Sequence, residues 1–587
     1  MLNPSPTGST PLRPWGPLFR QHLGIPMLLL CYFLFVALWS LLPVLREFSS
    51  CVPAPVSGVR TVPLFNVWTI IWNSQQFQRG FDGYWDAPVF FPERRAFAFS
   101  EPQPATLLLA PLHPHKRTPA LALNLWLVIS LTLNGLFTVR LLRILCVPML
   151  FATAAGTAMV LHPLVHDQLD SAQLVPLWPS LWTLAALVKL RQCSCVPETT
   201  LRAVSARGLE VGIAFCWTAA CALHHALFLG LLLLLTGWTL IPFQSLRRWL
   251  PGAVAAGIIC LSLIPAANVI RSVLKGPDFV REESLVTQLS VSPLDFARTS
   301  ANAQLNLPAL RGGSFFPMNP GWIRLAAALL ACIGCYVGRC SLTADQRAAM
   351  RFLIAFTVVA ALLCMGPRLQ PGSWRIWSFL ADWLPGFAQV RSPFRFGYFF
   401  QAGLLLLSAI GGCVCCRLRV LQNHAWFRKL LTVLLVVIIS FEVLPGQLQL
   451  AGVPDLARPL DWIEEVQSQL PAGHGLLILP AAPTSNAAAF EETVRWMIRC
   501  TASGIPIVNG YSGFFPAAHY QLLQRLQKPW SGQLALELQR QHVAFVLAAE
   551  SGVAKQLSET QDSGLEPIWQ SDRSGAALFR INFREAP

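Results

Sequence analysis

The sequence predicts an α-helical polytopic membrane protein of about eleven transmembrane helices, followed by a soluble, extracytoplasmic domain of α/β or α+β class. The membrane part is predicted by composition. Of the 587 residues, 54% are hydrophobic and only 12% are charged, whereas soluble proteins carry about 25% charged residues. The mean hydropathy is +0.50. The soluble domain is predicted because charged residues become frequent after Pro445.

Apolar runs near the 20 residues that a spanning helix needs recur throughout residues 26–446. The predicted spanning segments are 26–45, 118–139, 144–161, 174–190, 208–223, 226–242, 250–269, 321–338, 352–367, 397–416 and 429–446. Residues 1–25 are expected to form a cytoplasmic N-terminal segment. The run 374–390 is short and is broken by Pro385, so we expect it to be interfacial or re-entrant. Long loops remain at 46–117 and 270–320, and the second is expected to cap the same outer cavity as the first.

The distribution of Lys and Arg predicts the orientation of these helices. With the N-terminus inside, the short inner loops are rich in Lys and Arg, and their only acids are Glu198 and Asp345. Cytoplasmic loops carry such a positive excess. An odd number of helices then places the C-terminal domain outside, on the face of the 46–117 loop. The formal charge of +15 is spread between hydrophobic runs, so nucleic acid is not an expected partner.

Residues 455–587 read as a soluble domain, because thirteen Asp and Glu outnumber ten Lys and Arg there. Short apolar runs that alternate with helical periods predict a small mixed sheet. The predicted strands are 474–480, 505–510, 541–549 and 577–581, and the predicted helices are 491–503 and 517–527. Since no Gly-rich phosphate loop follows a strand, we expect a domain that covers the outer face rather than one with its own chemistry.

The stretch from Val62 to Pro111, within the first long loop, combines aromatic residues with acids. Its residues 64–76 have apolar positions at helical spacing, which suits a helix lying flat on the bilayer. Asp82, Asp86, Glu93 and Glu101 follow within twenty residues. A carboxylate at a membrane surface can act as general base toward a hydroxyl, or help to hold a divalent cation that bridges a phosphate. These acids can equally belong to a solvated connector.

Two arginines precede the predicted helix 397–416, in the sequence QVRSPFRF. The guanidinium forks of Arg391 and Arg395 suit a phosphate or pyrophosphate group. Ordinary anchoring to lipid headgroups explains them as well. Glu442, near the end of the last predicted helix, is expected to pair structurally with an arginine, because intramembrane acids are costly unless paired.

Histidines occur at two other predicted helix ends on the outer face. His162 and His166 lie at one end, and His224 and His225 lie at a tight turn between two helices. Pro163 and the helix end weaken a metal-binding interpretation of the first pair. We therefore predict no metal site from either pair.

Several stretches together resemble bacterial polytopic membrane proteins of the GT-C glycosyltransferase type, in a branch with a soluble C-terminal domain. The stretches are PLFNVWTIIW (63–72), FDGYWDAPVFFPERRAFAFSE (81–101), 122–124, DSAQLVPLWPSLW (170–182), LPGFAQVRSPFRF (384–396), PIVNGYSGFFP (506–516) and HVAFVL (542–547). Each motif is loose, but together they extend over nearly the whole chain. The resemblance implies a multi-pass protein of the bacterial inner (cytoplasmic) membrane.

The resemblance also implies an activity, namely transfer of a sugar from a polyprenyl-phosphate donor to an acceptor on the outer face. The essential acid of such proteins lies in the first outer loop, and in this branch we expect it just ahead of the Pro-Leu-x-Asn-x-Trp box. Val62 holds that position here and cannot act as a base or ligand. Either another acid carries the role, with Asp86 preferred over Glu101 and Glu101 over Asp82, or catalysis has been lost.

Three functions follow from these observations, in order of preference. The first is an inverting glycosyltransferase in which Arg391 and Arg395 hold the departing phosphate. The second is a non-catalytic membrane protein of the same fold that binds or presents a lipid-linked glycan. The third is a transporter, which ranks last because Glu442 is the only clear buried acid in the predicted helices.

Overall fold

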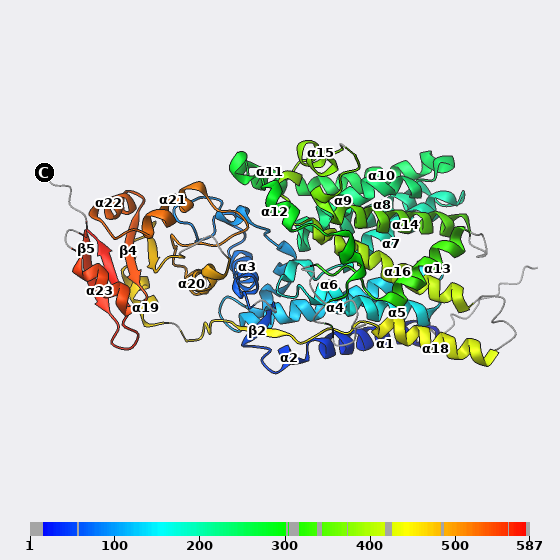
Figure 1. The fold of residues 1–587 in the computed structure, drawn as a ribbon, viewed down its shortest axis with the longest axis horizontal. Coiled ribbons are helices and arrows are strands. Elements are labelled where there is room, and N and C mark those ends of the chain that lie inside the picture. The colour runs from blue at the N-terminus through cyan, green and yellow to red at the C-terminus, as the bar shows by residue number, and fades with distance from the viewer. Residues whose placement is uncertain are drawn as a thin grey trace, which may run out of the picture.

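The computed structural model describes residues 16–55, 58–300, 303, 316–336, 343–372, 374–416, 425–458, 460–482, 487–560 and 563–582. Helices fill one end of the elongated molecule and a β-sheet with its helices forms the other end (Figure 1). The first long loop lies between the two ends. It joins them through helix α3, Thr61–Gln78.

Every predicted spanning segment overlaps a helix of the structure. The helices of this part are α1 (Gly16–Ser40), α2 (Leu42–Leu45), α4 (Pro119–Ile144), α5 (Met149–Val160), α6 (Pro163–His166), α7 (Trp178–Cys195), α8 (Leu201–Cys221), α9 (Leu223–Thr236), α10 (Leu246–Cys260), α11 (Ile264–Val273), α12 (Glu283–Gln288), α13 (Trp322–Tyr336), α14 (Ala344–Cys364), α15 (Ile376–Trp383), α16 (Gly397–Cys416) and α18 (Ala425–Phe441). The short α15, which exposes Phe379 and Trp383, occupies the run predicted to be interfacial or re-entrant.

Six helical segments among the described residues are long and apolar enough to cross a membrane. They are Pro119–Ile144, Met149–His166, Leu223–Leu240, Phe243–Val273, Ala344–Cys364 and Pro393–Cys416. The apolar helices Gly24–Ser40 and Trp322–Cys335 are shorter. The fold is therefore that of a polytopic helical membrane protein, while the number of about eleven spans stays a prediction.

Glu442, which directly follows α18, caps the start of another helix. Its two carboxylate oxygens accept the backbone N–H groups of Ile323 at 2.6 Å and of Arg324 at 2.8 Å, in the first turn of α13. The guanidinium of Arg324 is buried and donates to the backbone carbonyls of Pro320, Ile439 and Ser440. A negative group at the positive end of a helix is stabilising, so Glu442 has a structural role.

The helix of the first loop does not lie flat with one wet face, which corrects the sequence interpretation. Nearly all of α3 is buried, because α20, Glu491–Ser503, covers it. The indole N–H of Trp68 donates to the Thr501 hydroxyl at 2.9 Å, and the side-chain amide of Gln75 donates to the Thr501 carbonyl at 2.8 Å. The aromatic spacing that suits a membrane surface here serves contact with the C-terminal domain.

The C-terminal sheet is mixed, as predicted. Its strands are β3 (Gly475–Leu479), β4 (Val543–Ala548), β5 (Leu565–Gln570) and β6 (Ala577–Ile581), in the order β3-β4-β6-β5. Strands β3 and β4 are parallel, and the other two pairings are antiparallel. The helices beside α20 are α19 (Asp461–Gln469), α21 (Ala517–Leu526), α22 (Gly532–Arg540) and α23 (Ser551–Glu559). The prediction included α20 and α21 and missed β5, α19, α22 and α23.

The predicted strand 505–510 is wrong in type. Only Ile507 forms a bridge, parallel to Leu476 of β3. Pro506 has no N–H to donate, and the other side of the segment is occupied by the first loop. There the Ile507 N–H donates to the Pro88 carbonyl at 3.1 Å, and the Phe91 N–H donates to the Ile507 carbonyl at 3.0 Å.

A second link joins the two ends of the molecule. Strand β1, Cys51–Ala54, follows the first helix and pairs antiparallel with β2, Gln449–Gly452, which follows α18. One hydrophobic core continues from the helices through α3 to α20 and part of the sheet. The C-terminal domain therefore packs on the face of the helical part that carries the 46–117 loop.

Candidate functional site

Two of the three candidate acids lie at the surface. Asp82 is exposed in a turn where Phe81 and Gly83 both have positive φ values, 67° and 65°. Asp86 is also exposed, and its Oδ1 accepts the Arg95 backbone N–H at 2.7 Å. This bond closes the turn, so the carboxylate of Asp86 already has a structural role.

Glu101 is different, because its carboxylate is buried against a helix end. It follows the 3-10 turn Ala96–Phe99, and its side chain is 11% exposed. Its Oε1 accepts the backbone N–H of His224 at 2.9 Å and also pairs with Nδ1 of the same residue. Its Oε2 is buried without a hydrogen-bond partner among the described residues.

The break between α8 and α9 provides the helix end that Oε1 of Glu101 contacts. Ala222 is extended, with φ −154° and ψ 118°, so α9 begins anew at Leu223 and its first N–H groups have no carbonyl within the helix. Such groups attract negative charge. The tight turn predicted at His224 and His225 therefore becomes a carboxylate-binding helix end.

Electrostatics keep Glu101 ionised. Burial alone would raise the pKa of this carboxyl, but the charge and hydrogen bonds of His224, together with the charge of Arg395, lower it to about 2. An ionised carboxylate only accepts hydrogen bonds.

Arg395 lies close to Glu101 at the start of α16. It belongs to the 3-10 turn Pro393–Phe396, is 8% exposed, and has a buried Nε with no hydrogen-bond partner among the described residues. Its neighbour Phe396 stacks on Phe228 of α9 with ring centroids 4.0 Å apart. This packing brings the two helix starts together, so that the charge of Arg395 acts on Glu101.

Asp170 is a further acid of this site, and its role was not anticipated from the sequence. Its Oδ1 is buried and unpartnered within the described part of the chain. Burial raises the pKa of Asp170 to about 6, and the nearby positive charge of Arg395 opposes this rise. Glu101, Asp170, His224 and Arg395 together form what we call the acid–arginine cluster.

The Val62 position is next to this cluster. The side-chain amide of Asn66 donates to the backbone carbonyl of Val62 and to that of Asp170, each at 3.0 Å. One asparagine thus ties the start of α3, where the resemblance places an acid, to the loop that carries Asp170. Asp170 opens the motif DSAQLVPLWPSLW, which was the available signal for it.

Arg391 lies further out than Arg395. It is exposed, and its charge acts on Arg395, Arg281 and Tyr511. Burial and the charge of Arg391 lower the pKa of Arg281 to about 10. The guanidinium of Arg281 lies 3.7 Å from the ring centroid of Phe514 and donates to the Gly513 carbonyl at 2.6 Å. Loop 270–320 thereby contacts the C-terminal domain, as a capping segment would, although residues 301–302 and 304–315 lie outside the described residues.

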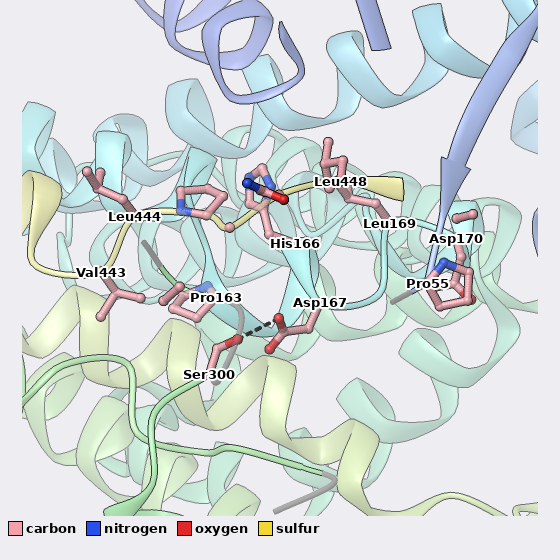
Figure 2. Close-up of a pocket in the computed structure, with 15 residues that line it drawn as sticks. Pro55, Pro163, His166, Asp167, Leu169, Asp170, Ser300, Val443, Leu444 and Leu448 are labelled. Atoms are coloured by element: carbon pink, nitrogen blue, oxygen red, sulfur yellow. Dashed lines mark hydrogen bonds between the residues drawn. The ribbon is translucent and has the colours of Figure 1, made fainter. Parts of the chain in front are cut away.

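A pocket lies beside the cluster, between the α6 end and the chain that leaves α18. Figure 2 shows Asp167, whose Oδ1 accepts the Ser300 hydroxyl at 2.7 Å, and Asp170 beside Pro55. His166 and Leu448 lie on the opposite wall from Ser300. No group of three or more His, Cys, Asp or Glu side chains in the described ranges is arranged to hold a metal ion.

Comparison with known proteins identifies the fold. No protein-family model matches the sequence, and no curated protein matches it. A cryo-EM structure of arabinofuranosyltransferase AftD from mycobacteria matches with a TM-score of 0.55 at 13% sequence identity, over 96% of this chain and 42% of that chain. The chain therefore corresponds to less than half of the length of AftD.

Two further structures match with lower scores. A crystal structure of the Archaeoglobus fulgidus oligosaccharyltransferase has a TM-score of 0.45 at 11% identity, covering 94% of this chain and 73% of that chain. ArnT from Cupriavidus metallidurans, bound to undecaprenyl phosphate, has a TM-score of 0.43 at 11% identity, covering 96% and 99%.

The chain is a multi-pass membrane protein with the fold of the GT-C type membrane glycosyltransferases. The similarity to AftD supports this assignment of fold, because it is a similarity of fold and not of sequence.

Proposed function

We propose that this protein is a membrane glycosyltransferase that moves a sugar from a polyprenyl-phosphate donor to an acceptor hydroxyl on the outer face of the membrane. The observation that supports it is the convergence of Glu101, Asp170 and Arg395 at buried helix ends, beside the position that an acid holds in the resembling proteins. Burial strengthens electrostatic interactions at such a site.

The reaction assigns a role to each side of the cluster. The acceptor oxygen loses its proton to a base and bonds to the anomeric carbon, and the bond from that carbon to the phosphate oxygen breaks. The departing phosphate keeps the electron pair, and Arg395 with Arg391 stabilises its charge. Glu101 is the first-loop acid that this geometry favours, in place of Asp86, because Asp86 is exposed and closes a turn.

Transfer of labelled sugar from polyprenyl-phosphate donors in isolated membranes tests this function. Glu101→Gln should lower the rate by about 10²–10⁴, the usual effect of losing acid–base catalysis. Asp86→Asn is the matched control from the same loop and should keep the wild-type rate. Full activity in Glu101→Gln together with loss in Asp86→Asn would exclude the assignment to the acid–arginine cluster.

One observation favours the non-catalytic alternative, a protein that binds or presents a lipid-linked glycan. Val62 stands where the resemblance places the essential acid, and its carbonyl shares Asn66 with Asp170. If the wild type transfers no sugar and Val62→Asp restores transfer, this alternative is correct. Wild-type transfer that Val62→Asp does not increase excludes it.

A further inference from the structure

We propose that His224, oriented by Glu101, is the group that takes the proton from the acceptor hydroxyl. This inference rests on the proposed function and adds to it the identity of the base. In the resembling proteins the acid of the first loop carries the essential role, whereas here the geometry points to a histidine on α9.

The first observation is that Glu101 fixes the ring of His224 at two points. Its Oε1 accepts the backbone N–H of His224 at 2.9 Å and also contacts Nδ1 of the ring. Since an ionised carboxylate cannot donate, Nδ1 carries the ring proton. The other nitrogen, Nε2, then holds a lone pair that can accept a proton.

The second observation is the difference in access between the two side chains. The carboxylate of Glu101 is 11% exposed, and its Oε1 is already used by His224, whereas the His224 side chain is 26% exposed. The Nε2 atom of His224 has no hydrogen-bond partner among the described residues. An acceptor hydroxyl therefore meets the imidazole more readily than the carboxylate.

The third observation is that His225, the adjacent histidine, is not available for this role. It is 0% exposed, and its ring lies 5.5 Å from the Tyr398 ring and 5.6 Å from the Phe399 ring. Of the two histidines at this turn, only His224 combines a carboxylate partner with an accessible nitrogen.

The position of Arg395 completes the arrangement. Its charge acts on Glu101, so a phosphate held by Arg395 lies near the pair. In the reaction, Nε2 takes the acceptor proton as the acceptor oxygen bonds to the anomeric carbon and the phosphate leaves with the electron pair of the broken bond. The resulting imidazolium is stabilised by the Glu101 carboxylate until it releases the proton to water, as in other carboxylate-oriented histidine bases.

The test compares His224→Gln, Glu101→Gln and the double variant in the labelled-sugar assay, over a range of pH. His224→Gln should lower kcat by about 10²–10⁴ with little change in KM. The double variant should be no slower than His224→Gln, because the two residues act as one unit. His113→Gln is the control, because His113 is exposed and lies in the first long loop, which also carries Glu101.

The pH profile separates a base from a structural histidine. The charged or titratable groups that act on this turn are Glu101, His225 and Arg395. Wild-type kcat should fall at low pH as the imidazole becomes protonated. Glu101→Gln should change the position of that fall, because it removes the carboxylate that contacts Nδ1 of His224. This change can be measured even if His224→Gln fails to fold.

The outcomes distinguish this inference from the proposed function. An active wild type whose His224→Gln variant folds and keeps its rate and pH profile would overturn the inference alone. Glu101→Gln with an unshifted acid limb would also overturn it. A wild type without any transfer would overturn the proposed function, and the inference with it.

Discussion

The pKa values of the two carboxyl groups of the acid–arginine cluster are shifted in opposite directions, although burial by itself raises both. Glu101 receives two hydrogen bonds from His224 and has its pKa lowered to about 2, whereas Asp170 has a buried, unpartnered oxygen and a pKa raised to about 6. Desolvation favours the neutral form of an acid unless donors compensate for it. Near neutral pH Glu101 is ionised, and Asp170 titrates closest to the working range.

The raised pKa of Asp170 predicts a pH dependence of stability. An acid whose pKa is higher in the folded state binds its proton more tightly there. The contribution of Asp170 to stability is therefore full below its ordinary pKa of 3.8, and it is lost as the pH rises through about 6. Asp170→Asn should remove this loss, which amounts to about 3 kcal/mol between pH 3.8 and about 6. Thermal unfolding of the purified protein between pH 4 and 7 checks it. Parallel pH curves for variant and wild type would contradict the raised pKa.

Arg395 carries a prediction about phosphate binding. Its buried guanidinium has no carboxylate partner in hydrogen-bond contact among the described residues. Arg395→Ala should weaken polyprenyl-phosphate binding by about 1.5–3 kcal/mol, the usual contribution of hydrogen bonds to a charged group. Titration of the purified protein with polyprenyl phosphate measures it. Arg79→Ala, at an exposed arginine of the first loop, is the control, and equal weakening in both variants would leave Arg395 as an ordinary anchor.

At the scale of elements, the helices approach one another through small residues. A Cβ added at Gly411 of α16 would lie 1.7 Å from the Ala327 carbonyl oxygen of α13, and one at Gly208 of α8 would lie 2.0 Å from the Gly252 carbonyl oxygen of α10. Membrane helices associate by such close packing, because lipid offers no hydrophobic driving force between them. The glycines therefore fix the distance between these helices.

Gly411→Ala should destabilise the protein by about 1–3 kcal/mol, because backbone atoms of α13 must move away from the new methyl group. Gly257→Ala is the matched control within α10, since nothing lies within 4 Å of its added Cβ. There the change should be neutral or stabilising by about 0.5–1 kcal/mol, through lower backbone entropy in the unfolded chain. Thermal unfolding in detergent compares the two. A Gly411→Ala variant as stable as Gly257→Ala would show that the helix pair can relax.

At the scale of the whole molecule, the first loop holds the C-terminal domain and the helical part together. Helix α3 packs on α20, segment 88–91 bonds to the chain around Ile507, and β1 pairs with β2. These contacts place the C-terminal domain on the face of the helical part that carries the 46–117 loop. The C-terminal domain is therefore joined to the helical part at several points and not only through the chain that leaves α18.

The arrangement gives the topology prediction a direct test. The positive charge of the predicted inner loops predicts that the shared face lies outside the cytoplasm, so protease added to intact spheroplasts should remove residues after about Pro445. Cleavage only in inverted vesicles would show that the protein has the opposite orientation in the membrane. Since the first loop and the domain lie on one face, a reporter fused within 46–117 should give the same side as one fused at the C-terminus.

The class of fold and most of the elements follow from the pattern of hydrophobic residues along the chain. Each predicted hydrophobic run overlaps a helix, because a spanning helix must satisfy its own backbone and be apolar along its whole length. The short helices α6 and α12 were not predicted. Alternating apolar runs found β3, β4 and β6. The alternation did not predict β5, because its sequence LEPIWQ contains a proline and a charged residue. It wrongly predicted a strand at 505–510, where Ile507 forms a single bridge beside the first loop.

Which side chains come together at the candidate site depends on how the chain packs. The sequence favours Asp86 over Glu101. In the structure Asp86 closes a surface turn, whereas Glu101 reaches the first turn of α9, 123 positions away along the chain. The pairing of Glu101 with His224, and the closeness of Asp170 to Val62 through Asn66, depend on how helices separated in sequence end at the same place. The spacing of residues within one segment of the sequence does not predict such contacts, because they arise from the packing of whole helices.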